Sequence, residues 1–490
     1  MGCYRGAMAS CPSPRRPWGW LACLALGACA AGQGGRSMGE DDTGSSVGSS
    51  GGSDGGAVTT MVATLDEGSS GTLPTSLTNA DDDDGGGPAV CGDGNLDVNE
   101  ICDDGNTDDA DGCNADCTPS GEILWEQTVG SGLAGVDEGF GVSVDAAGNF
   151  VVVGYVATAA GGNDGWVRRY SPMGGAYWTV MHAGPGAGND NFTGVGLDAD
   201  GSVYAVGYQS GADASNDGLV RKVDTFGADL WVSAFDAPSA AASTVVQNVA
   251  IDDAGNVIVV GYHDSTAAGQ EIMLRKFGPD GTVAWTRSYG GAALGDDRGY
   301  GVAATVGGDI YVAGTEFVAA EAFNMWLGKY DVDGNLLWSR GTNGAASLDD
   351  YLIAVEVDDD DDAYVCGYQG TVNQPWQTFL RRYDSDGVIV WTDQYLGETM
   401  EGAHCSGLGR APDGDLVMVG GEIEATVRAA LVRRVSADGD VKWSRKYPGG
   451  AAGPDYGRDA FIDDAGVIYV TGALDVGTDA RDLWVAQLSP

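Results

Sequence analysis

Short apolar runs alternate with polar turns from residue 121 to residue 490. A representative unit has a strand at 141–145 (GVSVD), a turn at 146–149 (AAGN) and a more apolar strand at 150–155 (FVVVGY). A longer polar loop and a strand at 166–170 (WVRRY) follow, and a glycine turn then leads to a strand that ends at a tryptophan. Runs of this length, bounded by Gly, Asn and Asp, predict β-strands joined by hairpins. Each unit is therefore expected to form four strands.

Tryptophans mark the period of this unit. They are separated by 53, 53, 54, 53, 53 and 52 residues, at Trp125, Trp178, Trp231, Trp285, Trp338, Trp391 and Trp443. Four short strands in such a period are typical of one β-propeller blade. The last copy stops at 484–488 without its fourth strand, and the run 121–125 (GEILW) supplies it. We predict an all-β, seven-bladed β-propeller over 121–490, with an N-terminal strand that closes blade 7 and removes the free sheet edges.

The turns of the units carry a family resemblance. Asp252-Asp253-Ala254-Gly255-Asn256 leads into an apolar strand that ends at Gly261-Tyr262. This pattern resembles the beta-propeller repeat of exported bacterial proteins, and the resemblance covers residues 121–490. It implies the fold and leaves the activity open, because propellers host unrelated functions.

The N-terminal segment predicts export. Arg15 and Arg16 precede an apolar stretch at 18–27, and Leu26-Gly27-Ala28-Cys29 is similar to the lipobox of bacterial lipoprotein signal peptides. The resemblance implies that residues 1–28 are removed and that Cys29 carries the lipid, which would anchor the protein in the bacterial envelope, at the outer membrane or cell surface. An ordinary signal peptide that contains a cysteine is the alternative, and Met8 is a second candidate start. Residues 29–90 continue as a Gly, Ser, Thr and Asp-rich segment without aromatic side chains, which predicts a disordered tether.

Four cysteines lie close together at 91–118, in CGDGNLDVNEICDDGNTDDADGCNADCT. Cys91-Gly92-Asp93-Gly94, Cys102-Asp103-Asp104-Gly105-Asn106, Asp111-Gly112-Cys113 and the final Cys117 resemble the myxococcus-type cysteine-rich repeat, apart from Asn99 where that family usually has glycine. The whole chain thus resembles exported lipoproteins of the myxobacterial type. A module of 28 residues is too small for a hydrophobic core, so disulfides are expected to hold it. The four cysteines allow three pairings, which stay open.

The acidic residues of this module have two interpretations. Calcium takes six to eight oxygen ligands, which Asp93, Asp103, Asp104, Asn106 and Asp111 would help to supply. The alternative is that these side chains only cap the turns between disulfides. Calcium is the one cofactor that the sequence suggests.

Charge narrows the range of partners. The chain has 25 Lys and Arg residues against 71 Asp and Glu residues, a net charge of −46. Removal of residues 1–28 takes away three arginines and no acid, leaving 22 basic and 71 acidic residues, or −49. Such a surface makes nucleic acid a poor partner, because phosphate binding needs a basic face. An envelope protein or a glycan is the expected ligand.

Acidic residues also recur just before the first strand of five units, at Asp137, Asp190, Asp297, Asp350 and Asp455, with Thr244 and Ala403 in the other two. If the first strand is innermost, these carboxylates lie at the mouth of the central channel, on the end with the longer and more variable loops. One interpretation is that each caps backbone amides, and the other is a ring that binds a metal ion or a cationic group. The long-loop end is where a ligand is expected.

Third strands and cysteines predict contacts within the propeller. Basic residues at 168–169, 221–222, 275–276, 329, 381–382 and 433–434 predict blade-to-blade ion pairs with Asp145, Asp198, Asp252, Asp358 and Asp463. Cys366 and Cys405 stand in consecutive blades, where a disulfide and two buried thiols are both open.

Catalytic motifs give little support for an enzyme. His182, His263 and His404 fall in three different blades and are expected to be solvated loop residues. No nucleophile motif or catalytic residue stands out. The sequence favours a binding or scaffold module for protein or glycan. The alternative is a secreted-type hydrolase or lyase that uses carboxylates of the long-loop face.

Overall fold

The computed structural model of the chain describes residues 90–490 except 97–99, 134, 160–161, 238–241, 266–268, 320, 345–347, 373–375, 401, 425–426, 450–453 and 478–480. Contacts divide the chain into two units, Met1–Asp84 and Gly85–Pro490. The predicted signal peptide, the lipidation site Cys29 and the tether up to residue 89 lie outside the described residues. In the described part, no helix has the length and apolar character needed to cross a membrane.

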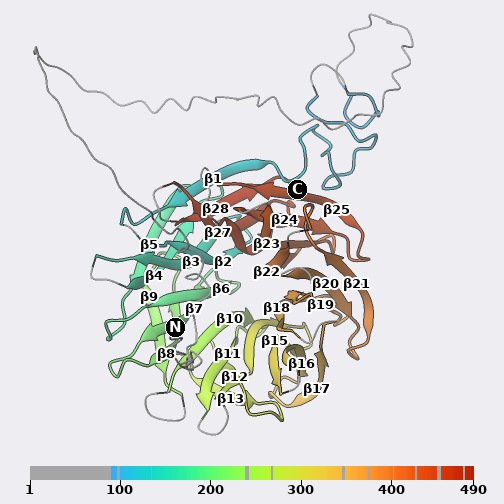
Figure 1. The fold of residues 1–490 in the computed structure, drawn as a ribbon. Helices are drawn as coiled ribbons and strands as arrows, with labels where there is room; N and C mark the ends of the chain where they lie inside the picture. Colours follow the sequence, from blue (N-terminus) through green and yellow to red (C-terminus); the bar gives the residue numbers. More distant parts are fainter. Residues whose placement is uncertain are drawn as a thin grey trace, which may run out of the picture. The chain divides into compact units, whose positions relative to one another are not determined.

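Within the described residues, twenty-eight strands form seven antiparallel sheets of four strands each (Figure 1), which confirms the seven-bladed propeller. Blade 1 contains β2 (Glu138–Val144), β3 (Phe150–Ala157), β4 (Asn163–Tyr170) and β5 (Ala176–His182). Blades 2 to 4 contain β6 (Asn191–Leu197), β7 (Val203–Ser210), β8 (Asn216–Val223), β9 (Asp229–Phe235); β10 (Thr244–Ile251), β11 (Val257–Ser265), β12 (Gly269–Phe277), β13 (Val283–Tyr289); and β14 (Arg298–Ala304), β15 (Ile310–Val318), β16 (Ala322–Tyr330), β17 (Leu336–Thr342). Blades 5 and 6 contain β18 (Asp350–Val357), β19 (Ala363–Gln369), β20 (Gln377–Tyr383), β21 (Ile389–Tyr395); and β22 (Ala403–Arg410), β23 (Leu416–Glu424), β24 (Val427–Val435), β25 (Val441–Tyr447).

Blade 7 joins the two ends of the domain. Its strands are β26 (Tyr456–Ile462), β27 (Ile468–Asp475), β28 (Arg481–Leu488) and β1 (Ile123–Val129), in the order β1-β28-β27-β26. β1 pairs antiparallel with β28, with Glu126 opposite Ala486. The predicted N-terminal strand closure is therefore confirmed, and the closed ring leaves no blade to be completed by another chain.

The first strand of each blade is innermost. A Cβ added at Gly194 of β6 would lie 3.1 Å from the Cα of Asn248 in β10, so first strands of neighbouring blades touch. Every first strand also has a β-bulge near its start, which inserts one extra residue into the ladder. The bulged residues are Phe140, Thr193, Gln247, Tyr300, Ile353, Ser406 and Arg458.

The repeated tryptophans join neighbouring blades. Trp178 donates its indole N–H to the carbonyl oxygen of Thr225 in the next blade, at 2.9 Å. Its ring covers Gly227 of the same turn, where an added Cβ would lie 2.9 Å from the indole. Trp231, Trp285, Trp338 and Trp391 make equivalent bonds to the carbonyls of Pro279, Val332, Ser385 and Ala437. The fourth strands continue beyond the tryptophan, as in Ala176–His182, so the expectation that they end there is wrong.

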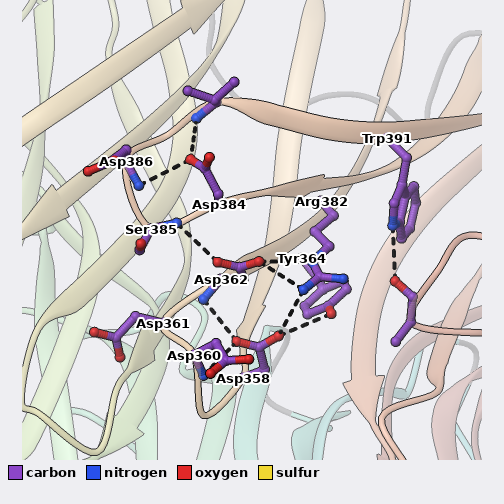
Figure 2. Close-up of polar contacts among 12 residues, drawn as sticks. Asp358, Asp360, Asp361, Asp362, Tyr364, Arg382, Asp384, Ser385, Asp386 and Trp391 are labelled. Atoms are coloured by element: carbon purple, nitrogen blue, oxygen red, sulfur yellow. Dashed lines mark hydrogen bonds and ion pairs between the residues drawn. The ribbon is translucent and has the colours of Figure 1, made fainter.

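Short turns close the first and third hairpins of each blade at one end of the propeller, and Figure 2 shows two of them in blade 5. Asp358 accepts the backbone N–H groups of Asp360 and Asp362, at 3.0 and 2.9 Å. Asp384 caps the next turn in the same way. The acidic run at 358–362 is thus a capped hairpin turn.

Basic residues of the third strands pair with these turns. Arg382 in β20 lies 2.9 Å from Asp362 and 3.7 Å from Asp358 (Figure 2). The same contact joins Arg169 to Asp145, Lys222 to Asp198, and Lys276 to Asp252. Turn and strand belong to one sheet in each of these four pairs, so the predicted connection to a neighbouring blade is wrong for them. Arg433 of β24 does pair with the neighbouring blade, through Asp393 of β21 at 3.1 Å. In blade 7, Asp463 instead accepts a hydrogen bond from the Tyr469 hydroxyl at 3.1 Å.

Candidate ligand site around the propeller axis

The five aspartates of the predicted ring lie at the start of first strands, and each is at most 2% exposed. In Asp190, one carboxylate oxygen accepts the N–H of Gly184 at 2.8 Å and the other accepts the N–H of Ser210 at 2.7 Å. Asp137, Asp297, Asp350 and Asp455 make the same pair of bonds, to the residues six before and twenty after, at 2.5 to 3.0 Å. These carboxylates cap backbone amides, as the first interpretation expects. Nowhere in the described ranges do three or more His, Cys, Asp or Glu side chains form a group that could hold a metal ion.

In blades 3 and 6, which lack this aspartate, an acidic residue of the second strand accepts the backbone N–H instead. In blade 3, Asp264 in β11 accepts the N–H of Ser243 at 2.9 Å. In blade 6, Glu422 in β23 pairs with Ala403 across the ladder and accepts the N–H of Glu398 at 2.6 Å. The capping function is therefore kept where the repeated aspartate is absent.

Other side chains border the axis at the end where the first strands begin. They occupy four positions that repeat in every blade: the bulge and the three sets given next. We call these four positions together the mouth. The first-strand set is Glu138, Asn191, Val245, Arg298, Tyr351, His404 and Tyr456. Its cross-strand partners in the second strands are Tyr155, Tyr208, Tyr262, Thr315, Tyr368, Gly421 and Ala473. The set at the start of the third strands is Asn163, Asn216, Gln270, Phe323, Trp376, Arg428 and Arg481.

Blades 4 and 5 give the mouth an aromatic sector, which consists of Tyr300, Phe323, Tyr351, Tyr368 and Trp376. The ring of Tyr351 lies 5.0 Å from that of Tyr368, 6.0 Å from Phe323, 6.3 Å from Trp376 and 6.5 Å from Tyr300. The rings of Tyr368 and Trp376 are 5.0 Å apart and nearly perpendicular. All five are half-buried. Aromatic rings offer flat apolar surfaces, so we call this group the aromatic wall.

Blades 6 and 7 give the mouth a basic sector, which consists of Arg428, Arg458 and Arg481 around Tyr456. The guanidinium carbons of Arg458 and Arg481 lie 4.5 and 5.2 Å from the centre of the Tyr456 ring. Arg458 also pairs with Glu138 of blade 1, with Nε 2.5 Å from Oε1. Glu138 is held on its other side by the Tyr155 hydroxyl, at 2.9 Å.

Arg428 joins this group through a glycine. Gly421 has no side chain, and an added Cβ there would lie 2.6 Å from His404 Cε1 and 2.7 Å from Arg428 Cδ. The glycine thus lets both side chains pack over the second strand. Burial lowers the pKa of Arg428, and the positive charges of Arg458 and Arg481 add to this effect. Burial, with help from Arg428 and Arg458, holds the pKa of His404 well below its usual value. His404 is therefore neutral at pH 7.

The three histidines lie in strands and not in solvated loops, so that expectation is wrong. His182 in β5 bonds to the Gln209 side chain at 2.9 Å, and His263 in β11 is 5% exposed. Burial lowers the pKa of both imidazoles. Only His404 belongs to the mouth.

Two acids lie on first strands beyond the bulges, farther from the mouth. Burial raises the pKa of Glu356 in β18 to about 8, and the charge of Asp459 adds to this. Burial likewise raises the pKa of Asp459 in β26 to about 7, although Asp459 accepts the N–H of Val142 at 3.0 Å. Asp459 thereby ties blade 7 to blade 1.

The cysteine-rich module contains one disulfide, between Cys102 and Cys113, while Cys91 and Cys117 are free. Cys91 and Cys117 lie next to each other, since hydrogen bonding to Cys91 raises the pKa of the Cys117 thiol to about 12. Of the three possible pairings, this arrangement fits only Cys102–Cys113 with Cys91–Cys117.

The proposed calcium ligands are largely occupied by the module itself. Asp103 accepts four backbone N–H groups, from Gly92, Asp93, Gly94 and Gly105, at 2.8 to 3.2 Å. Asp93 caps Asn95 at 2.9 Å, and Asp104 accepts the N–H of Cys113 at 3.1 Å. Asn106 donates to Asp111 Oδ2 at 3.1 Å, while Asp111 Oδ1 is buried without a partner. Turn capping accounts for most of these acids.

A second disulfide crosslinks two blades. Cys366 in β19 is bonded to Cys405 in β22, and both are fully buried in the cluster between blades 5 and 6. Of the two interpretations that the sequence left open, the structure contains the disulfide.

Sequence reasoning placed the ligand at this end of the propeller but missed the aromatic and basic residues of the mouth, although a signal was present. Core positions of the repeat keep one chemical character in every blade, whereas the mouth positions change. The third-strand position runs from Asn163 and Asn216 through Phe323 and Trp376 to Arg428 and Arg481. A repeat position that varies in this way is not needed for the blade itself.

No family model matches the chain, and no curated protein matches it. Among solved structures, the chain is similar to the β-propeller domain of the Trilobed protease from Pyrococcus furiosus, with 10% identity, 72% of this chain and 94% of that chain covered, and a TM-score of 0.42. It is also similar to Sqt1 from Chaetomium thermophilum, with 12% identity, 72% and 82% covered, and a TM-score of 0.41. A protein of unknown function from Bacteroides caccae has 14% identity, with 58% and 90% covered and a TM-score of 0.35.

Proposed function

We propose that this protein is an envelope-anchored binding module, and that its ligand, a protein or a glycan, binds at the mouth. A closed propeller supports a binding or scaffold role in general. One observation supports this location. The residues at the mouth positions differ from blade to blade, with aromatic side chains in blades 4 and 5 and arginines in blades 6 and 7. Clustered aromatic residues and arginine are the groups that dominate binding energy at protein surfaces.

The test compares the two ends of the propeller. The full chain is screened against envelope proteins and glycans, and each ligand found is retested with Trp376→Ala at the mouth and Asp386→Ala on the exposed turn of the opposite end. We expect Trp376→Ala to weaken binding by about tenfold or more, and Asp386→Ala to leave it unchanged. The reverse result would place the ligand at the short-turn end.

The anchor is a separate part of the proposal and rests on the lipobox resemblance around Cys29. Lipid attachment followed by a tether would hold the propeller at a membrane surface. Replacing Cys29 with Ala should abolish palmitate labelling and release the protein from the membrane fraction. Unchanged labelling would contradict the lipid anchor and leave the binding proposal untouched.

Calcium binding by the cysteine-rich module also stays a proposal. Burial and the neighbouring Asp104 raise the pKa of Asp111, whose Oδ1 has no partner. A cation there would relieve the repulsion between the two acids.

A carboxylate-dependent hydrolase or lyase is the second candidate function, and the raised pKa values of Glu356 and Asp459 are the observation that favours it. A carboxyl group that stays protonated near pH 7 can act as a general acid. The assay is release of reducing ends from oligosaccharides that bind the mouth, with Glu356→Gln as the variant. Turnover that is lost in this variant would favour the enzyme, and binding without turnover would favour the module.

A further inference from the structure

The basic sector carries excess positive charge within a strongly acidic chain. Arg428, Arg458 and Arg481 meet there, and within the described residues Glu138 is the carboxylate in an ion pair with this group, through Arg458. Among the side chains that the structure describes, Arg428 and Arg481 have no carboxylate within ion-pair distance, and Arg428 Nε is buried without a hydrogen-bond partner. In contrast, the third-strand residues Arg382 and Arg434 are both paired at the other end of the propeller. Arg428 Nε is thus an unmet donor, while Arg481 donates to the Tyr456 hydroxyl and lies within electrostatic range of the buried Asp455. Three guanidinium groups therefore meet at one end of a protein whose net charge is −46.

The position of these arginines is not explained by the stability of the blade. Arg428 and Arg481 occupy one repeat position in blades 6 and 7, where blades 1 and 2 have Asn163 and Asn216. At this position the backbone carbonyls join neighbouring blades. The carbonyl of Arg428 accepts the N–H of Asp455 at 2.8 Å, and that of Arg481 accepts the N–H of Asp137 at 2.9 Å. Any side chain would permit those bonds. The guanidinium groups instead converge from two blades and repel one another, which an anion placed between them would relieve.

The aromatic sector lies directly beside the basic sector. The ring of Tyr368 is 6.1 Å from that of His404, and His404 packs with Arg428 over Gly421. A ligand that fills both sectors needs a negative group at one end and a ring with an apolar face next to it. Neutral His404 between them offers a hydrogen bond and adds no charge.

We propose that the mouth binds a carboxylated sugar, with its carboxylate between Arg428 and Arg481 and its ring against Trp376 and Tyr351. Guanidinium groups bind carboxylates through paired, charge-assisted hydrogen bonds. The apolar face of a sugar ring packs on tryptophan and tyrosine, whose rings present flat apolar surfaces. This inference rests on the proposed function, because it specifies the ligand of the same mouth.

The experiment is calorimetric titration of the full chain with tetrasaccharides of galacturonate and of mannuronate. Their methyl esters serve as matched probes, because esterification removes the charge and keeps the rings. A tetraglutamate peptide keeps the charge and removes the rings. The variants are Arg428→Gln, Arg481→Gln and Trp376→Ala. Arg168→Gln is the control, since Arg168 also lacks an ion pair and bonds to Thr179 on the outer part of blade 1.

We expect at least one acidic tetrasaccharide to bind about 10- to 100-fold more tightly than its ester and than tetraglutamate. Arg428→Gln and Arg481→Gln should reduce binding of the acid to the level of the ester, and Arg168→Gln should leave it unchanged. Circular dichroism and melting temperature establish that each variant is folded, and Arg428→Gln supplies the result if Arg481→Gln unfolds.

Equal binding of acid and ester would overturn the inference, as would binding that neither arginine variant weakens. If tetraglutamate binds as tightly as the sugar and Trp376→Ala has no effect on binding, the mouth is an acidic peptide site instead. If no acidic sugar binds while Trp376→Ala still weakens a ligand from the general screen, the inference fails and the proposed function stands. If the mouth variants affect no ligand, both fail.

Discussion

Glu422 of β23 lies opposite Ala403 of β22 and supplies the buried carboxylate that this blade lacks at its first strand. It accepts the N–H of Glu398 at 2.6 Å and the Tyr395 hydroxyl at 2.9 Å, and its side chain is fully buried. In five of the other blades an aspartate at the start of the first strand makes the equivalent bond to the preceding loop, and in blade 3 Asp264 of β11 accepts the N–H of Ser243. The cap is thus a requirement of the blade, because buried backbone N–H groups need a partner.

Glu422→Ala should therefore destabilise the protein by about 2–4 kcal/mol, since two donors lose a charged acceptor. Glu398→Ala is the matched control, because that side chain is mostly exposed and pairs with Lys446 at the surface. Urea denaturation of the two variants measures the difference. Equal midpoints would mean that the Glu422 contacts contribute nothing to folding.

Closure of the ring predicts a large effect of removing β1. Glu126 accepts the Trp484 indole N–H at 3.1 Å, and Tyr447 donates its hydroxyl to the Gly121 carbonyl at 2.6 Å. Deleting residues up to 127 should lower the melting temperature by at least about 5 °C and promote association through the exposed edge of β28. Deleting residues 30–90 should leave it nearly unchanged. Melting curves that coincide would contradict the closure.

The Cys366–Cys405 disulfide should contribute to stability across blades 5 and 6. Replacing both cysteines with alanine should cost about 2–4 kcal/mol by the loop-closure argument. The measurement is denaturation of wild type and double variant, with and without a reductant. The reductant should lower the stability of the wild type alone, and an equal effect on both proteins would point to Cys102–Cys113 instead.

Glu356 predicts a pH dependence of stability. Its pKa is raised from 4.5 to about 8 in the folded protein. Below pH 4.5 the carboxyl is protonated in both states, so it has no effect. As the pH rises toward 8 the unfolded chain loses this proton first, and stability falls until the pH passes the folded pKa. Glu356→Gln should therefore stabilise the protein at pH 9 by about 1–3 kcal/mol and leave its stability unchanged at pH 4. This range is smaller than the full pKa shift implies, because solvent near the axis screens the charge.

A stabilising effect of Glu356→Gln that is the same at both pH values would reflect packing and not titration. Asp459→Asn is unsuitable as a control, because that carboxylate also bonds to Val142. Glu398→Gln serves better, since Glu398 is mostly exposed.

Calcium should raise the melting temperature if the cysteine-rich module binds it. At a hundred times the dissociation constant, one site would add about 2.7 kcal/mol. The melting temperature is compared in calcium, magnesium and sodium at matched ionic strength, because all three salts screen the net charge of −46. Asp111→Asn should abolish a calcium-specific rise. Equal melting in the three salts would remove calcium from this protein.

The sequence by itself determined the blade. The sequence shows a period of about 53 residues, apolar runs of strand length, and turns rich in Asp and Gly. These patterns are local, because each concerns contacts within one sheet or the single tryptophan contact to the next blade. The seven blades, the closing strand and the capping role of residues such as Asp190 could therefore be predicted. Local patterns also misled, because the pairing of Arg382 with its own blade depends on which turn its side chain reaches.

Only the tertiary structure decided how the mouth is composed. Glu138 and Arg458 are 320 residues apart, and they meet because the ring closes and brings blade 7 beside blade 1. Arg428, His404 and Tyr368 occupy three different repeat positions, and they come together because blades 5 and 6 pack side by side. A repeat shows which positions are equivalent, but the spatial order of their side chains follows from the closed ring. That order places an aromatic wall beside three arginines in an acidic protein.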